Sequence, residues 1–199
     1  ASTSVPGGEV GGSSGYSLRN SQSNKRCRNF GIDKNFIPAY GLSLVAGRNF
    51  ENDKPVADTS QLVNILVNET AAKIFGFTRP ADILSQYIDG GGFHCQVIGV
   101  VKDYHQESLR YSFDPIVFYL EEERGFGNFS LKLSTTNLPA LMDFVKLKWS
   151  EHFPESPFKY FFLDDRFNAQ YKNDKLFATV LWLFTAIAIS IACLGLFGL

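Results

Sequence analysis

The end of this sequence lacks charge. Residues 176–199 contain no Asp, Glu, Lys or Arg and no proline, so all 19 Lys+Arg and all 20 Asp+Glu lie before residue 176. A helix rises about 1.5 Å per residue, so this run would span roughly 36 Å, more than a hydrocarbon core of ~30 Å. Its many Leu, Ile, Phe and Val residues favour insertion into lipid. The sequence predicts a transmembrane helix at 176–199; a buried core helix, the alternative, would normally show a polar stripe.

Cysteine and methionine are scarce, and there is no basic block. The net charge is −1, and nucleic-acid-binding proteins concentrate Lys and Arg, so nucleic acid is not an expected partner. Cys193 lies in the apolar run; Cys27 and Cys95 could pair in an oxidising compartment, but we expect unpaired thiols. Met142 is the only methionine and the sequence opens at Ala1, so we expect an internal piece of a longer protein whose targeting signal lies upstream.

Histidine motifs of zinc enzymes are missing as well. His94, His105 and His152 have neither HxxxH nor HExxH spacing. The cluster KDYH at 102–105 carries acid–base groups, but neighbouring residues on a strand point to opposite faces. We therefore interpret 102–105 as a strand end whose polar groups form hydrogen bonds, not as a catalytic dyad.

The glycine-rich segments do not match nucleotide-binding loops. DGGG at 89–92 lacks the Lys and Ser/Thr of a phosphate loop, and GFGN at 125–128 lacks the third glycine of a dinucleotide loop. The three glutamates at 121–123 suit a solvated turn better than a calcium site. We expect no catalytic, cofactor-binding or metal-binding residue, no cofactor, and no nucleotide hydrolysis by this chain alone.

Alternating and continuous apolar segments predict an α+β domain with a mixed sheet. Residues 87–88 and 93–101 form a hairpin in this interpretation, with 89–92 as its turn. The Gly-, Ser- and Asn-rich residues 1–29 are predicted to be a strand end at 2–5 and a long mobile loop. The other predicted strands are 62–67, 116–120, 129–133 and 158–163.

Capping residues predict the helices. Asp33 or Asn35 begins a short helix before Gly41, Asn68 caps a helix that stops at Gly76, and 81–86 form a helical turn. A helix from Asn137 should bury one face, because apolar residues recur every three or four positions at Leu138, Leu141, Met142, Val145 and Trp149. The last helix should begin at Asp164 or Asp165 and continue unbroken into the apolar run.

Four stretches are similar to known sequences. They are YGLSLVAGRNF at 40–50; VNETAAKIFG at 67–76; VIGVVKDYHQESL at 97–109 with PIVF at 115–118; and FFLDD at 161–165 with QY at 170–171 and IACLGLFG at 191–198. Together, in order and spacing, they resemble the extracytoplasmic domain and following membrane helix of permeases of the MacB/FtsX family of ABC transporters. Asn49 departs from the acidic residue common there. The glycines, Asn68 and Pro115 of these stretches suit turns, caps and strand entrances rather than a reaction centre.

The resemblance implies a MacB-like outer domain at 30–163, preceded by the loop 1–29 of a truncated domain and followed by a long helix at 164–199. It implies a non-catalytic permease subunit in the bacterial inner membrane, with residues 1–175 outside the cytoplasm. The implied partners are a cytoplasmic ABC ATPase subunit, a second permease copy or homologue, membrane lipid, and a periplasmic adaptor or envelope substrate. Its implied role is to couple ATP hydrolysis to export or envelope remodelling by mechanotransmission.

Two alternatives remain at this stage, a membrane-anchored sensor or receptor domain and an anchored envelope enzyme. A permease should continue after residue 199 with a short basic loop and more apolar spans, and a sensor with a signalling domain. Lys159, Arg166, Lys172 and Lys175 precede the apolar run, and a count of positive flanks would place them in the cytoplasm. Long domains are translocated largely regardless of flanking charge, so the family's orientation is preferred.

Overall fold

The computed structural model describes the backbone of all residues except 6–11, 20, 22, 52, 56–61, 105–111, 122–126, 135 and 198–199; of 166–176 it describes the backbone alone. The chain divides into two compact units, Ala1–Pro157 and Phe158–Leu199. The first holds the sheet and the shorter helices, and the second holds one long helix.

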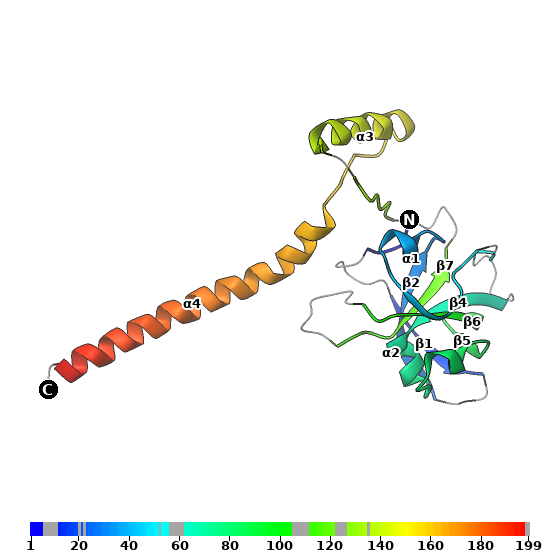
Figure 1. Cartoon of the computed structure of the whole chain (residues 1–199), viewed down its shortest axis with the longest axis horizontal. Coiled ribbons are helices and arrows are strands. Elements are labelled where there is room, and N and C mark those ends of the chain that lie inside the picture. The colour runs from blue at the N-terminus through cyan, green and yellow to red at the C-terminus, as the bar shows by residue number, and fades with distance from the viewer. Residues whose placement is uncertain are drawn as a thin grey trace. The chain divides into compact units, whose positions relative to one another are not determined.

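The first unit is built on a seven-stranded mixed sheet (Figure 1). Parallel pairings join β4 to β6 and β2 to β7, and the other neighbouring strands are antiparallel. The α+β prediction is therefore confirmed. In the order of pairing, the strands are β3 (Leu44–Gly47), β6 (Phe93–Val101), β4 (Leu62–Asn68), β7 (Ile116–Leu120), β2 (Lys25–Ile32), β1 (Ser13–Leu18) and β5 (Tyr87–Gly90).

The sheet closes on itself at β6. One edge of β6 pairs with β4 along its length, and the opposite edge is shared by two strands. There the first half of β6 pairs with β5 and the second half with β3. Since β5 also pairs with β1, the strand order from β6 through β4, β7, β2, β1 and β5 returns to β6. Closure satisfies backbone groups that an open edge would expose.

Apolar side chains pack into two clusters on opposite faces of the central strands. Along β4, Val67 contributes to one cluster and Leu66 to the other, as the two-residue period of a strand requires. The first cluster is covered by α2 (Glu69–Ile74) and the 3₁₀ turn η1 (Pro80–Ile83), and the second by α1 (Phe36–Ala39). The largest buried rings of the second cluster are Phe30, Phe36, Phe50 and Phe118.

Residues 12–32 differ from the loop predicted over 1–29, because β1 and most of β2 lie there. Tyr16 and Cys27 are buried, while the neighbouring Ser, Gly and Arg residues occupy partly solvated positions. Because these neighbours are small or charged, the sequence shows no clear alternation of apolar and polar residues. β1 pairs with β2 on one side and with β5, about seventy positions later, on the other, and the sequence around β1 does not indicate the distant partner. Cys27 and Cys95 are free buried thiols, and burial raises the pKa of each to about 12.

Most local predictions are confirmed. β4, β6 and β7 match the predicted strands within a residue, and β5 and β6 meet at a turn in which Gly91 and Gly92 have φ of 63° and 87°. α2 ends just before Gly76, where φ is 93°. Asn35 precedes α1, but its side chain makes no capping bond; the Phe36 N–H instead donates to the backbone oxygen of Asp33 at 3.2 Å.

The region after β7 differs more. Helix α3 (Leu138–His152) begins as predicted, since the Asn137 side chain accepts a hydrogen bond from the Ala140 N–H at 3.2 Å. The prediction of a buried face is wrong: no residue of α3 is buried, although Leu141, Met142, Val145 and Trp149 are half-buried. The predicted strands 129–133 and 158–163 are also absent, because the described residues supply no partner strand to either.

The second unit confirms one continuous helix. α4 runs for 35 residues, Leu163–Phe197, and begins one residue before the predicted start. Asp164 and Asp165 lie in its first turn, where carboxylates are stabilised by the positive end of the helix dipole. No residue between Arg166 and Ala192 is glycine or proline, so nothing in the sequence breaks the backbone ladder there.

Gly47 ends β3 at the point where the chain passes closest to β6. Its φ is 75°, and a Cβ added there would lie 2.2 Å from the backbone oxygen of Ile98. Gly41 also has a positive φ, 65°, but a Cβ there would meet nothing within 4 Å. Gly47 is therefore required both by its positive φ and by the lack of space for a side chain. Gly41 is required by its positive φ alone.

We predict that Gly41→Ala lowers the free energy of unfolding by about 1–2 kcal/mol, the cost of a left-handed alanine. Gly47→Ala should cost about 1–3 kcal/mol more, because strand β3 must also move away from β6. Urea unfolding followed by circular dichroism measures both. Equal midpoints for the two variants would contradict the close approach at Gly47.

Candidate functional site

Two of the three histidines, His94 and His152, lie in the described part of the chain, and both are exposed. His94 Nδ1 lies 2.7 Å from Asp89 Oδ1 on the β5–β6 hairpin, and Arg19 Nη2 lies 3.4 Å from the same oxygen. The hydrogen bond from His94, with Arg19 adding to it, holds the pKa of the Asp89 carboxyl below its usual value. This exposed group joins β1 to the hairpin. His152 contacts the backbone oxygen of Lys148 one turn earlier in α3.

The structure describes only some of the remaining candidate residues. Of 102–105, Lys102 is exposed, Tyr104 stacks near Phe118 with ring centroids 6.4 Å apart, and His105 lies outside the described residues. So do parts of the segments 121–123 and 125–128. Among the residues that the structure describes, no group of three His, Cys, Asp or Glu side chains could hold a metal ion.

Two of the four sequence stretches meet at Asn68. This side chain, at the end of β4, is fully buried. Its Oδ1 accepts hydrogen bonds from the Ala71 N–H at 3.0 Å and the Ile116 N–H at 2.9 Å. Its Nδ2 donates to Asp103 Oδ1 and to the Asp114 backbone oxygen, both at 2.8 Å. Asn68 therefore caps α2 and also ties β4 to the segments that follow β6 and precede β7.

Asp103 completes this junction. Its Oδ1 accepts from the Thr70 N–H at 3.0 Å and its Oδ2 from the Thr70 hydroxyl at 2.8 Å. The Asp103 N–H in turn donates to Glu69 Oε2 at 3.0 Å. Thus Asp103 and the residues NET at 68–70 satisfy one another's hydrogen-bonding groups, and the Asp103 carboxylate stabilises the fold.

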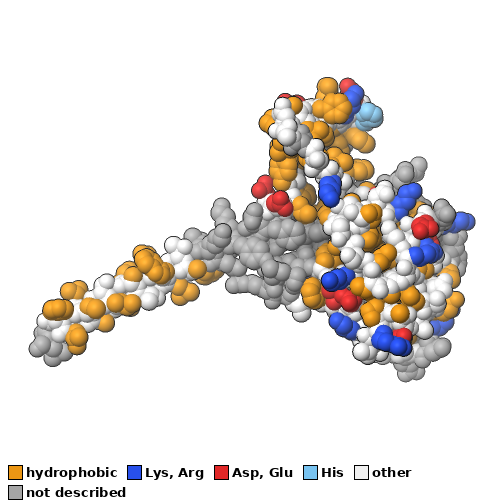
Figure 2. All heavy atoms as spheres, viewed as in Figure 1, with side chains coloured by type: hydrophobic (Ala, Val, Ile, Leu, Met, Phe, Trp, Pro, Cys, Tyr) orange, Lys and Arg blue, Asp and Glu red, His pale blue; other side chains and the backbone are white. Residues whose placement is uncertain are grey.

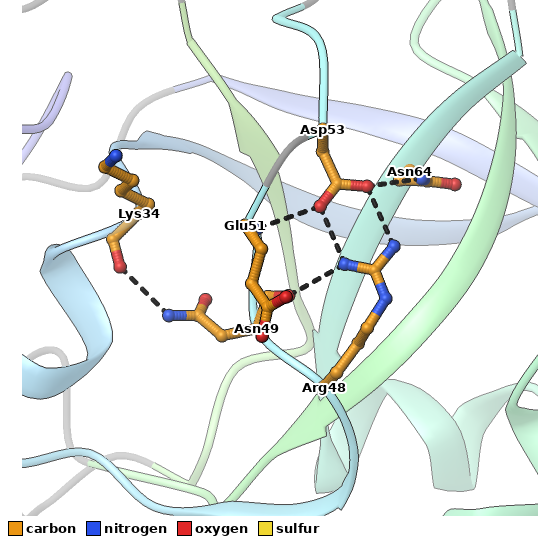
Figure 3. Close-up of polar contacts among 6 residues, drawn as sticks. All are labelled: Lys34, Arg48, Asn49, Glu51, Asp53 and Asn64. Atoms are coloured by element: carbon orange, nitrogen blue, oxygen red, sulfur yellow. Dashed lines mark hydrogen bonds and ion pairs between the residues drawn. The ribbon is translucent and has the colours of Figure 1, made fainter.

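A second polar cluster lies where β3 leads into the following loop (Figure 3). Arg48 forms a bidentate pair with Asp53, Nη1 to Oδ2 at 2.7 Å and Nη2 to Oδ1 at 2.9 Å. Asp53 also accepts from Asn64 Nδ2 at 2.6 Å and from the Glu51 N–H at 3.0 Å. The Arg48 side chain is 48% exposed but that of Asp53 only 5%, so the acid is the anchored partner.

The electrostatics of this cluster stabilise the ionised carboxylate of Asp53. The hydrogen bond from Arg48, aided by those from Glu51 and Asn64, holds the pKa of the Asp53 carboxyl well below its usual range, although partial burial opposes the shift. Asn49 donates from Nδ2 to the Lys34 backbone oxygen at 2.9 Å, which ties the loop to the start of α1 (Figure 3). Phe50, in the same stretch, is buried in the second apolar cluster.

Neither Asp53 nor Asp114 was predicted from the sequence as a structural anchor. The sequence does contain a pattern that could have indicated Asp53. Arg48 lies between a turn glycine and an apolar Phe50, and an arginine in such a position favours an acidic partner nearby. No comparable signal marks Asp114, whose backbone oxygen rather than side chain bonds to Asn68. Its carboxylate forms a separate ion pair with Arg28 at 3.1 Å.

The end of α4 is a further candidate functional segment. Phe177–Phe197 is long and apolar enough to cross a membrane, with a mean hydropathy of 2.4 and none of its most apolar window buried. Figure 2 shows hydrophobic and uncharged side chains, without Lys, Arg, Asp or Glu, along this described part of the helix. The Thr185 and Ser190 hydroxyls donate to backbone oxygens four residues earlier, as suits an apolar medium.

No family model and no curated protein matches the sequence. A domain of a putative permease protein from Porphyromonas gingivalis matches the structure with a TM-score of 0.51 and 16% identity, over 75% of this chain and 74% of that one. This chain has the fold of that permease domain. The sequence resemblance and the fold therefore agree.

Two further solved structures are similar at lower scores. The periplasmic region of MacB from Actinobacillus actinomycetemcomitans has a TM-score of 0.48 and 18% identity, over 71% of this chain and 64% of that one. The extracellular domain of the noncanonic ABC-type transporter YknZ from Gram-positive bacteria has a TM-score of 0.39 and 16% identity, over 56% and 51%.

The Asp53 pair predicts a dependence on pH. Because the folded-state pKa of Asp53 lies below the unfolded value near 3.9, the pair stabilises the fold above that value and its contribution is lost as pH falls through the folded pKa. Asp53→Asn should cost about 1–3 kcal/mol at pH 7. The gap to the parent chain should narrow below pH ~4, as urea unfolding at several pH values can show; a constant gap would contradict the ion pair.

The Asn68 junction predicts a contrast between two substitutions. Asn68→Ala removes four hydrogen bonds. Asn68→Asp keeps an acceptor for the Ala71 and Ile116 N–H groups, but it replaces the donor with a carboxylate oxygen that faces Asp103 and the Asp114 backbone oxygen. At pH 7 both should cost at least about 3 kcal/mol, with the acid variant the less stable. Since protonation restores a donor, the acid variant should regain stability relative to the alanine variant as pH falls towards 4. Thermal unfolding of both variants between pH 7 and pH 4 tests this prediction. If the stabilities of the two variants changed in parallel over this range, the prediction would be contradicted.

Proposed function

We propose that this chain is part of an ABC transporter permease subunit: an extracytoplasmic domain followed by a helix that enters the bacterial inner membrane. The proposal rests on one observation, that two features occur in the same chain. A domain with the fold of a permease domain is followed by one unbroken helix whose last part is apolar and exposed. An anchored sensor is the competing function, but no described feature favours it.

In this proposal the outer domain extends to about residue 163 and the membrane segment occupies 176–199. Between them, the part of α4 from Leu163 to residue 176 rises roughly 21 Å. A helix without glycine or proline resists bending, so displacement at one end is transmitted to the other. That is the physical basis for coupling between the outer domain and the bilayer.

The polar clusters support a mechanical role over a chemical one. Asn68, Asp103 and Asp53 have their hydrogen-bonding groups occupied by one another and by backbone groups. Such groups hold strands and loops in place and leave no free acid or base at these positions. We therefore propose that the subunit is not an enzyme and that ATP hydrolysis belongs to a separate cytoplasmic partner, with a second permease copy or homologue beside it.

The test is a hinge placed in α4. Inserting Gly-Gly after Asn173 should cost about 1 kcal/mol of helix stability per glycine and create a flexible point. Inserting Ala-Ala at the same place adds the same length and rotation but keeps the helix rigid. In the full-length protein, expressed in a strain that lacks the native gene, the glycine variant should lose transport-linked activity.

The alanine variant should retain more activity than the glycine variant, and both should fold and insert equally well, as protease protection of the outer domain can establish. Equal activity of the two insertions would overturn transmission through a rigid helix. Full activity of both, combined with inactivation by a polar substitution that leaves the fold intact, would instead favour an anchored enzyme.

A further inference from the structure

Helix α3 has a second apolar face besides the half-buried stripe that contains Val145 and Trp149. An α-helix turns about 100° per residue, so Ala140, Phe144 and Leu147 lie together on the side roughly opposite that stripe. Phe144 and Leu147 are each 56% exposed. Figure 2 shows hydrophobic side chains on the surface of α3, in the place that Figure 1 labels. This face therefore exposes an aromatic ring and a leucine side chain that are neighbours on the helix.

Glu151 limits this face towards the end of α3. It follows Leu147 by four positions and therefore lies on the same side of the helix. Its Oε2 lies 2.7 Å from Lys148 Nζ, and both side chains are exposed. A carboxylate that keeps its water and its lysine does not join an apolar contact. A partner packed on this face would therefore be centred on Phe144 and Leu147.

Charged side chains lie on either side of the apolar face. Asp143 lies roughly 70° to one side of its centre and Lys148 roughly 70° to the other. Both residues are exposed. In the heptad notation of packed helices, Ala140 and Leu147 occupy d positions and Phe144 an a position. This assignment places Asp143 at g and Lys148 at e, the two positions that flank a contact between helices.

These charges are complementary to those of an identical helix. In a parallel pair of helices, a g residue lies beside the e residue of the partner five positions further along, and Lys148 follows Asp143 by five. Two copies of α3 would thus form two such ion pairs, one on each side of the apolar contact. In an antiparallel pair each flank would meet the same flank of the partner, which would bring like charges together.

We propose that the face of α3 formed by Ala140, Phe144 and Leu147, with Asp143 and Lys148 at its flanks, binds the same face of a second copy of this chain in a parallel arrangement. The occupant follows from the charge pattern, because the two flanks are opposite in sign and have the spacing that an identical helix matches. Removal of the apolar side chains from water stabilises the contact, and the flanking pairs set its direction.

The contact is too small to hold two free domains together. α3 has 15 residues, and one pair of such helices is a smaller contact than the ~1,200–2,000 Å² of a stable interface. Two copies anchored in one membrane meet at a much higher local concentration, so a weak contact is then sufficient. This inference therefore rests on the proposed function, which anchors the chain through α4 and places a second copy beside it.

The first test is disulfide formation between copies. The full-length protein carrying Cys193→Ser and Leu147→Cys is oxidised with copper phenanthroline in membrane vesicles from the expressing cells. The matched control is Lys146→Cys, at an exposed position that is turned about 100° away from Leu147. Because a disulfide requires Cα atoms within about 7 Å of each other, Leu147→Cys should form covalent dimers at least about tenfold faster than the control. Cys193→Ser alone gives the background.

The second test reverses the charges in the Leu147→Cys variant. Asp143→Lys places a lysine beside the partner's Lys148, so two attractive pairs become repulsive. Disulfide formation should slow by at least about fivefold. Adding Lys148→Asp restores opposite charges and should recover most of the rate. This recovery would show that the loss comes from charge and not from a misfolded helix.

Several results would overturn the proposal: equal disulfide formation at positions 147 and 146, no effect of Asp143→Lys, or a loss that Lys148→Asp fails to restore. A disulfide from position 147 to a protein of different sequence would also overturn it. Both tests measure contact between copies and neither measures transport. Failure here would therefore leave the proposed function standing, and failure of the hinge experiment would leave this contact standing.

Discussion

The four hydrogen bonds of the buried Asn68 side chain are the constraint on which the domain depends. One amide group caps α2, holds the first residue of β7 and bonds to the segment after β6. These elements belong to two separate sequence stretches, and no other described side chain joins so many of them. A buried amide with all of its groups satisfied stabilises only one arrangement, because any displacement leaves donors or acceptors unpaired.

From this junction the rest of the sheet follows. With β4, β6 and β7 held in place, the free edge of β6 must find partners, and it finds two, β3 and β5. Gly47 lets β3 approach closely, and the bidentate Arg48–Asp53 pair secures the chain as it leaves. β5 then brings in β1 and closes the structure. In the described parts of the similar stretches, Arg48, Asn68 and Asp103 thus hold strands and loops in place.

The predictions from sequence succeeded where the signal is local. Asn68, Asn137 and the glycines at 91 and 92 act within a few residues of their own positions, so their neighbours in sequence identify them. β1 was missed because one of its two partner strands, β5, lies far along the chain, and because its outward residues are small and polar. The second role of Asn68 was missed for the same reason, since Asp103 and Ile116 are distant in sequence.

The errors at 129–133 and in α3 have a different origin. There the local pattern was that of a strand and an amphipathic helix, yet the described residues bury neither. Apolar periodicity reports that a face requires a partner, not that the partner lies within the same stretch of chain. The same holds for α4, whose exposed apolar surface suits lipid. Among the described residues, most of the exposed large apolar side chains follow β7, and such surface is stabilised by contact with other polypeptide or with lipid.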